Sequence, residues 1–365
     1  MRLLAISRDN PNVMKTVWRL LSKEVEDLGN PGLLDLICYL HPTHTSFQKF
    51  CSALCELTEE EKEDGVVPVD VSSLIGQLHG WFNSSTARRE DLTKIGEEFY
   101  DLNDDFEEEL SQFFKRHVAT RWLEMGPCLK RLLGRWRTTV HYFTVFLPAS
   151  KDSSDKKAVQ TDRFKSIHNA LKPSTRETTK AKVKSTLYVC SLTNQYLKVF
   201  QSSKPMIHNL SSNSTEMFKS VAQLVLKESD FEKMCSNQSY SEVDFFDTDV
   251  LRSPSRCETL KTVISEELET LTVAEQRKLV YDVRFGLQHM SDYLQHHLPL
   301  SDPFLLNIGF LHPRARITWN GDTKPSLTAA AVYVAKHMKR FSEEELMGMQ
   351  VQLGVYQARD EYKAF

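Results

Sequence analysis

The sequence predicts a mainly α-helical protein with a small α/β lobe at its start. Leu, Glu and Lys are frequent, whereas Gly and Pro each occur only 13 times in 365 residues, a balance that favours helices. Apolar residues recur at three- and four-residue spacing over much of the chain after residue 113. Two short apolar runs near the start are separated by a helical pattern, which predicts two strands joined by a helix.

Composition excludes several classes of protein. No uninterrupted apolar run approaches the roughly 18 residues of a transmembrane helix, so we expect no membrane partner. Lys and Arg number 46 against 49 Asp and Glu, so no overall positive charge indicates nucleic-acid binding. The apolar stretch Leu3–Ile6 is too short for a secretory signal, and seven scattered Cys without a CxxC pair indicate a reducing compartment. We therefore expect an intracellular protein.

Residues 1–55 form the predicted α/β lobe. The run at 2–7 ends in a polar turn, and Pro11 then opens a helix for which Asn10 is a plausible cap. A second apolar run at 33–40 predicts another strand, followed by another helix. The crossover rule makes the two strands parallel.

Residues 56–112 form a predicted acidic connecting region. From Glu56 to Leu110 there are 17 Asp and Glu against four Lys and Arg. Such a segment is typical of a solvated loop and the outer faces of helices. It would repel a phosphate backbone, so we do not expect it to face DNA.

Residues 113–300 form a predicted helical domain. Trp122, Leu129, Leu132 and Trp136 are expected on one inner helix face. Within this domain, residues 149–186 hold ten Lys and Arg against four Asp and Glu. We expect a basic loop or linker there with one short helix, and its charge permits contact with nucleic acid. A polar break is expected at residues 211–214.

Two capping pairs define later helices. Thr272 with Glu275, and Ser342 with Glu345, have the spacing of a capping box. The second pair opens the last helix of a C-terminal helical segment, residues 301–365. No fixed-period repeat is present, which argues against a solenoid.

Three short motifs carry candidate chemistry. Asp9 directly follows a predicted strand, where α/β sheets place catalytic carboxylates, although such a residue is also typical of a turn or cap. Cys38 and His41 supply two metal ligands, and because a closed zinc site needs four, we expect a buried structural pair and no metal. Arg121 and Trp122 could clamp a phosphate and stack a base, or Trp122 could be a core anchor.

The order of these motifs resembles that of the hAT superfamily of DNA transposases (hobo/Activator type). The segment from Asp9 to Met14, the CxxH at Cys38 and His41, and the Arg121–Trp122 pair are similar to the family's second catalytic acid, its CxxH and the start of its helical insertion. The resemblance extends to Phe310–Arg314, which is similar to the family's LDPR turn. It implies a remnant of a ribonuclease-H-like domain plus a large helical insertion domain.

The departures from the family pattern imply a catalytically inactive protein. Asp9 is the counterpart of one acid of the catalytic triad, and the first acid, the catalytic Glu, the dimerisation segment and a BED-type zinc finger are not recognised. We therefore expect a chain truncated at both ends. Two-metal phosphoryl transfer needs several carboxylates, so Asp9 alone is expected to bind Mg²⁺ weakly. No cofactor is expected unless the protein is active.

Three interpretations remain open at this point. The first is a transposase-derived, inactive protein that retains a helical body for binding DNA or protein, and it favours the nucleus over the cytoplasm. The second is an active, Mg²⁺-dependent hAT-type transposase or nuclease whose missing carboxylates come from unrecognised positions. The third is a helical scaffold unrelated to transposases.

Overall fold

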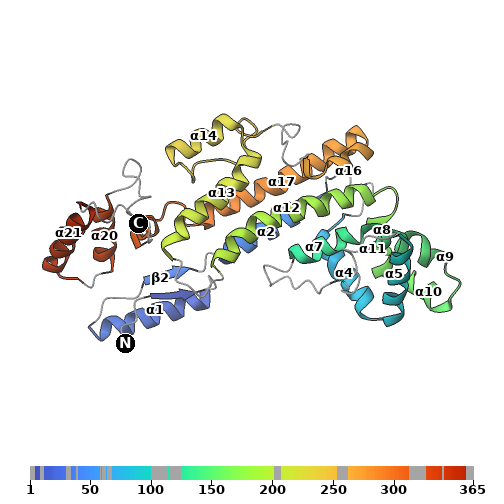
Figure 1. The fold of residues 1–365 in the computed structure, drawn as a ribbon, viewed down its shortest axis with the longest axis horizontal. Helices are drawn as coiled ribbons and strands as arrows, with labels where there is room; N and C mark the ends of the chain where they lie inside the picture. The colour runs from blue at the N-terminus through green and yellow to red at the C-terminus, as the bar shows by residue number, and fades with distance from the viewer. Residues whose placement is uncertain are drawn as a thin grey trace. The chain divides into compact units, whose positions relative to one another are not determined.

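The computed structural model is mainly α-helical, with two short strands (Figure 1). It describes residues 5–8, 12–29, 34–37, 40–57, 59, 63, 68–99, 114, 125–200, 207–252, 262–311, 326–338 and 341–358. The chain divides into two compact units, each built from separated stretches of sequence. Unit 1 comprises Met1–Thr43, Lys198–Lys219 and Leu294–Phe365, and unit 2 comprises His44–Leu197 and Ser220–Tyr293. The boundaries expected at residues 55, 112 and 300 stay a prediction.

Unit 1 begins with a parallel pair of strands. Strand β1 (Ala5–Arg8) pairs with β2 (Leu34–Ile37), with Ala5 opposite Leu34. Helix α1 (Asn12–Asp27) connects them, and α2 (Leu40–Ala53) follows, of which the part from His44 onwards belongs to unit 2. The predicted strand–helix–strand–helix order and parallel pairing are thus confirmed. Among the described residues the sheet contains these two strands alone, so no ribonuclease-H sheet is seen in that part of the chain.

The C-terminal part of unit 1 is a small helical cluster. It contains α18 (Pro303–Ile308), the 3₁₀ turn Gly309–Leu311, α20 (Leu327–His337) and α21 (Glu343–Ala358). The predicted capping box of α21 is confirmed, because the Ser342 amide donates to Glu345 Oε2 over 2.7 Å and the Glu345 amide donates to the Ser342 hydroxyl over 3.2 Å. The buried core of this helical cluster consists of Phe304, Leu305, Ile308 and Val334, with Ile207, Leu210, Phe310 and Met338 packed against them.

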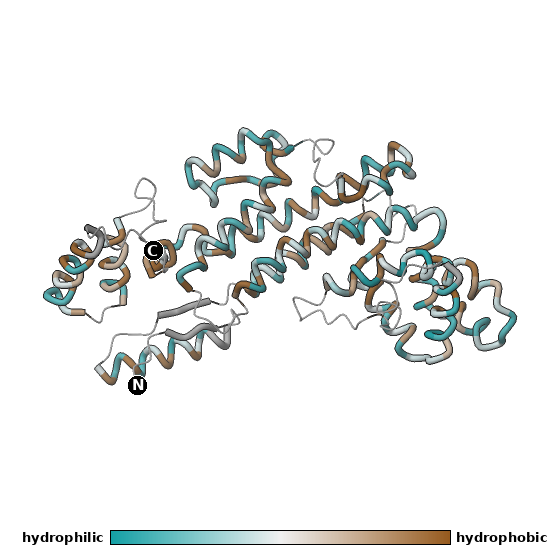
Figure 2. The backbone as a smooth tube through the Cα atoms, in the orientation of Figure 1, coloured by the Kyte–Doolittle hydropathy of each residue, from teal (hydrophilic) through white to brown (hydrophobic). Residues whose placement is uncertain are grey.

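Unit 2 contains most of the remaining helices. Figure 2 shows apolar and polar residues alternating along them, as amphipathic helices require. Leu129, Leu132 and Trp136 are buried as predicted. These helices are α4 (Val71–Asn83), α5 (Thr86–Phe99), α7 (Met125–Gly134), α8 (Trp136–His141), α9 (Leu147–Ala149), α10 (Ser153–Ala158), α11 (Asp162–Leu171), α14 (Glu228–Asn237) and α16 (Ser265–Thr270), with most of α12 (Arg176–Phe200) and α17 (Val273–His297) and the end of α13 (Leu210–Val225).

Aromatic rings fill the core between α4, α8 and α11. Trp81 and Phe82 of α4 lie 5.5 and 5.9 Å from Phe143, measured between ring centroids, and Phe164 of α11 lies 6.0 Å from both Trp81 and Phe143. The Trp81 indole N–H donates to the Tyr142 hydroxyl over 3.4 Å. Burial raises the pKa of Tyr142 to about 12. These rings bury large apolar areas and hold the helices in one arrangement.

A π-helical turn interrupts the path from α8 to α9. Residues Tyr142–Phe146 form i→i+5 hydrogen bonds, and α-helical geometry resumes at Leu147. Tyr142 and Phe143 are fully buried, whereas Val145 on the same turn is 51% exposed. The wider turn therefore aims two rings into the core without ending the helix.

Three expectations about local structure are wrong. Residues 149–186 are largely helical, because they contain α10, α11 and the first half of α12. Residues 211–214 lie inside α13 and do not interrupt it. The acidic region 56–112 supplies more than a connector, since six side chains of α4 are buried in the core of unit 2: Val71, Leu74, Ile75, Leu78, Trp81 and Phe82.

Helix α17 is the long core helix of unit 2. Thr272 caps it as predicted, because its amide and hydroxyl donate to Glu275 Oε2 over 2.8 and 2.6 Å. Gly286 on α17 lets the helix approach Phe50 of α2 closely, since a Cβ at this position would lie 2.8 Å from the Phe50 ring. Phe50 is fully buried at that contact.

Candidate functional site

The structure does not bring the residues predicted from motifs into a site. Asp9, Cys38, Arg121 and Trp122 lie outside the described residues, so their expected roles stay predictions. His41 lies in the first turn of α2 and is exposed. The expected burial of a structural Cys/His pair is therefore wrong for its histidine.

The described ranges contain neither a metal-binding cluster nor a membrane-spanning helix. Across the described ranges, no group of three or more His, Cys, Asp or Glu side chains is placed to hold a metal ion. None of the helices in those ranges is long and apolar enough to span a bilayer.

The basic segment 149–186 uses part of its charge inside the fold. Lys182 of α12 lies with its Nζ 3.2 Å from Asp282 Oδ2, and both side chains are buried. Lys180 and Lys184 place their Nζ atoms 2.8 and 2.9 Å from Oε1 of Glu267, whose side chain is fully buried. The three lysines at every second position of α12 are thus partners of α16 and α17, and they cannot contact an external phosphate without losing these ion pairs.

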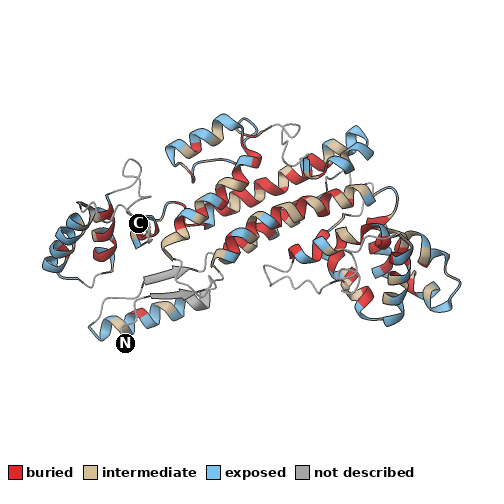
Figure 3. Cartoon of the chain, in the orientation of Figure 1, coloured by how far each residue is buried: buried red, intermediate tan, exposed pale blue. Residues whose placement is uncertain are grey.

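Four of the seven remaining basic side chains of the segment lie on the outer face of α10 and α11. Lys156, Lys157, Arg163 and Lys165 are exposed, and Figure 3 shows α10 as largely exposed helix. Of these four, Lys165 lies 3.9 Å from Asp162, which is exposed, and the other three form no ion pair within the described part of the chain. We call Lys156, Lys157, Arg163 and Lys165 the basic face.

Local sequence explains why the basic face points outwards. Asp152 caps α10 by accepting from the Ser154 amide over 2.7 Å, and Thr161 caps α11 by accepting from the Phe164 amide over 3.3 Å. Between these caps the apolar residues face inwards, because Ala158, Phe164, Ile167, Ala170 and Leu171 are buried. Helical periodicity then leaves the lysines on the opposite side.

Arg163 is held against the backbone of α4. A Cβ at Gly80 would lie 3.3 Å from the Arg163 guanidinium carbon, so the glycine makes room for the guanidinium. The guanidinium of Arg88, on α5, stacks 3.9 Å from the centroid of the Trp81 ring of α4. Both cations therefore lie beside the aromatic core with their side chains ordered by packing.

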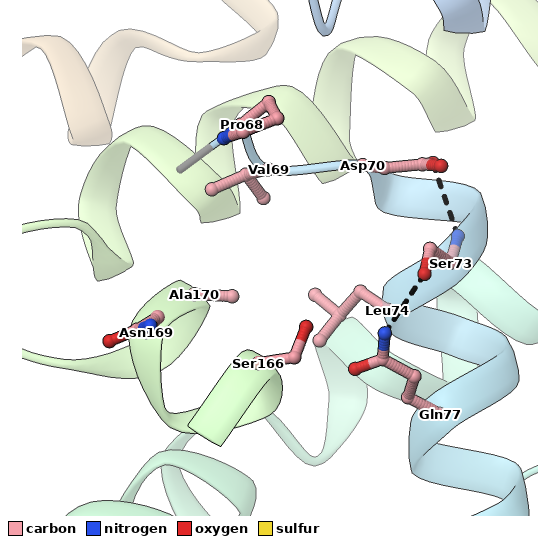
Figure 4. Close-up of a pocket in the computed structure, with 9 residues that line it drawn as sticks. All are labelled: Pro68, Val69, Asp70, Ser73, Leu74, Gln77, Ser166, Asn169 and Ala170. Carbon is pink, nitrogen blue, oxygen red and sulfur yellow. Dashed lines mark hydrogen bonds between the residues drawn. The ribbon is translucent and has the colours of Figure 1, made fainter. Parts of the chain in front are cut away.

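A small hollow lies between α4 and α11 (Figure 4). Its volume is about 50 Å³, enough for about three or four water molecules. Ser73 and Gln77 of α4 face Ser166 and Asn169 of α11 across it. The Gln77 amide nitrogen donates to the Ser73 hydroxyl over 3.0 Å. The hollow lies at the edge of the basic face and is too small for a nucleotide.

Three cysteines of unit 2, Cys51, Cys55 and Cys190, are poor nucleophiles. Burial raises the pKa of Cys51 well above its ordinary value and raises the pKa of Cys55 and of Cys190 to about 11. The Cys55 thiol donates to the Cys51 and Val69 carbonyls over 3.1 and 3.3 Å. Because the thiolate is the reactive form, these thiols are structural.

Comparison with known proteins identifies no relative. No family model, no curated protein and no solved structure matches the chain. The basic face is the candidate site within the described residues. The sequence predicts it only in part. The net charge of residues 149–186 is visible in the sequence, but the division between internal and exposed lysines depends on acids about 80 to 100 positions away.

Proposed function

We propose that the protein is a transposase-derived, catalytically inactive binding protein whose helical body contacts DNA through the basic face. One observation supports the proposed DNA contact. Three exposed cations on two consecutive capped helices, Lys156, Lys157 and Arg163, have no carboxylate partner in the described part of the chain. Unpaired surface cations are available to replace the counterions of a phosphate backbone.

The transposase origin is supported by the first residues and by the motifs. A parallel β1–α1–β2 unit precedes a large helical body, an order compatible with a helical insertion into a ribonuclease-H-like domain. Asp9 is the single counterpart of the family's catalytic triad that the sequence offers. A single carboxylate cannot hold two divalent ions, so the proposal assigns binding and not catalysis. For a protein that binds DNA in this way we expect a location in the nucleus.

Binding is tested by fluorescence anisotropy on a labelled DNA duplex of about 30 base pairs, at salt concentrations from about 50 to 200 mM. The test variant combines Lys156→Ala with Lys157→Ala, the two lysines of the basic face that have no carboxylate partner in the described part of the chain. Each lost phosphate contact lowers the slope of log K against log salt by about 0.9. We expect weaker binding and a flatter salt dependence.

A matched control removes exposed cations elsewhere in unit 2. Lys233 of α14 and Arg277 of α17 are exposed, so Lys233→Ala with Arg277→Ala tests the effect of charge alone. Equal losses in both variants contradict the basic face, and unchanged binding in the lysine variant does the same. The resemblance also assigns a phosphate contact to Arg121, so Arg121→Ala is measured beside them.

Catalysis is tested separately with DNA ends and Mg²⁺ or Mn²⁺. We expect neither nicking nor joining, and no change in Asp9→Asn. Metal-dependent cleavage that disappears in Asp9→Asn would replace the inactive protein with an active transposase.

A further inference from the structure

Unit 2 carries a second surface, formed by four aromatic rings. Tyr281, Phe285 and His289 follow one another at four-residue spacing on α17, and Phe246 continues the row. Centroid distances are 6.0 Å from Tyr281 to Phe285, 4.6 Å from Phe285 to His289 and 5.1 Å from His289 to Phe246. Tyr281 is 45% and Phe246 is 43% exposed. We call these four residues the aromatic ladder.

The loop that carries Phe246 is fixed onto α17. Phe245 is fully buried, and its carbonyl accepts from Gln288 Nε2 over 2.8 Å. The Asp244 carboxylate accepts from the Phe246 amide over 2.8 Å, which turns the next side chain outwards. At the loop's end, Arg284 donates to the Arg252 carbonyl over 3.3 Å. The ladder is therefore preorganised, and binding would not need to order it.

The segment beside the ladder is strongly acidic. Residues 227–252 hold seven Asp and Glu against three Lys and Arg. Asp247 Oδ1 accepts from the Asp249 amide over 2.8 Å, so the carboxylates of the loop are held by its turns. Four acids of the loop are exposed next to Phe246 in sequence: Glu242, Asp244, Asp247 and Asp249.

We propose that the aromatic ladder and this acidic loop bind an arginine-rich peptide segment of a partner protein. A guanidinium can stack on an exposed ring and pair with a carboxylate at the same time. The ladder already contains a cation–π contact, because the Arg284 guanidinium lies 5.6 Å from the Tyr281 ring centroid. A nucleic acid would be repelled by the acids, and an apolar peptide would leave them without partners.

The probe is a fluorescein-labelled peptide in which arginine alternates with glycine, measured by anisotropy on the full chain. Tyr281→Ala and Phe246→Ala remove exposed rings, and we expect each to weaken binding about two- to fivefold, the size of one cation–π contact at an exposed site. Asp244→Asn with Asp247→Asn keeps the oxygen that accepts the turn hydrogen bond and removes two charges. We expect weaker binding and a smaller salt dependence in this variant.

Controls distinguish the effect of ring stacking from that of charge, and binding at the ladder from binding at the basic face. Tyr333 on α20 of unit 1 is 40% exposed, so Tyr333→Ala removes an equally exposed tyrosine outside the ladder and should bind normally. A lysine–glycine peptide should bind more weakly than its arginine counterpart. The alanine variant of the basic face should bind the peptide unchanged, so failure here leaves the DNA proposal standing. Unchanged binding in a Tyr281→Ala, Phe246→Ala double variant would overturn the proposal, as would equal losses in Tyr333→Ala.

Discussion

Lys182 of α12 and Asp282 of α17 form a buried ion pair, with 3.2 Å between Nζ and Oδ2. Each charge has one further partner. Lys182 Nζ donates to the Leu54 carbonyl over 2.9 Å, and Lys278 Nζ donates to Asp282 Oδ1 over 2.6 Å. The pair therefore connects α12 and α17 with the end of α2, and its two members are not equivalent, because only Asp282 has a second opposite charge.

Removing Asp282 should lower the free energy of unfolding more than removing Lys182. In Asp282→Leu the buried Lys182 loses its counter-charge, and we expect a loss of about 3 to 5 kcal/mol in the free energy of unfolding. In Lys182→Met, Asp282 keeps Lys278, so we expect a smaller loss. The double variant should recover part of the stability. Urea denaturation of the three variants measures this order, and equal losses in both single variants would contradict it.

A second prediction concerns the close approach of α17 and α2. The 2.8 Å contact of an added Cβ with the Phe50 ring makes Gly286→Ala destabilising, by about 1 to 3 kcal/mol for an overpacked core. Gly76 on α4 has nothing within 4 Å of such a Cβ. Gly76→Ala should therefore stabilise the protein by up to about 1 kcal/mol through helix propensity. Thermal unfolding should show a lower melting temperature for Gly286→Ala and a higher one for Gly76→Ala. Shifts in the same direction would contradict the close contact.

A third prediction is alkaline instability. Unfolded thiols release their protons near pH 8.5, whereas burial raises the pKa of Cys190 to about 11. The stabilising contribution of the neutral thiol is thus complete below about pH 8.5 and is lost as the pH rises towards 11. At pH 10 the loss is about 2 kcal/mol for this thiol. The stability difference between the wild type and Cys190→Ala should shrink from pH 7.5 to pH 10, and a constant difference would contradict the shift.

The fourth prediction tests the caps. Thr272→Ala removes the hydroxyl that accepts from the Glu275 amide over 3.3 Å, and Ser342→Ala removes its counterpart in α21. We expect each to cost about 1 kcal/mol in the free energy of unfolding. Ser241→Ala, in an exposed loop position, is the control and should have no measurable effect.

Local signals in the sequence predicted the elements that depend on near neighbours. Thr272 with Glu275 and Ser342 with Glu345 satisfy each other over three residues, so a single sequence contains both partners. The parallel strands β1 and β2 were likewise predictable, because a strand–helix–strand order allows few connections. The inner face with Leu129 and Leu132 follows from periodicity alone.

Features that depend on distant partners were not predictable. Lys180, Lys182 and Lys184 looked like part of a solvated loop because Glu267 and Asp282 are remote in the sequence. The aromatic ladder had a visible signal in the four-residue spacing of Tyr281, Phe285 and His289, but Phe246 joins it only through the fold. The motif residues Asp9, Arg121 and Trp122 stay predictions, since they lie outside the described residues.

The π-helical turn at Tyr142–Phe146 has a consequence for insertions and deletions. An i→i+5 turn contains one residue more than an α-helical turn, and Val145 is its exposed member. Deleting Val145 would let α8 and α9 join as one continuous α-helix, while the residues on both sides keep their orientation towards the core. A homologous chain is therefore expected to tolerate a one-residue gap in the middle of this helix, where a gap would otherwise rotate every following side chain.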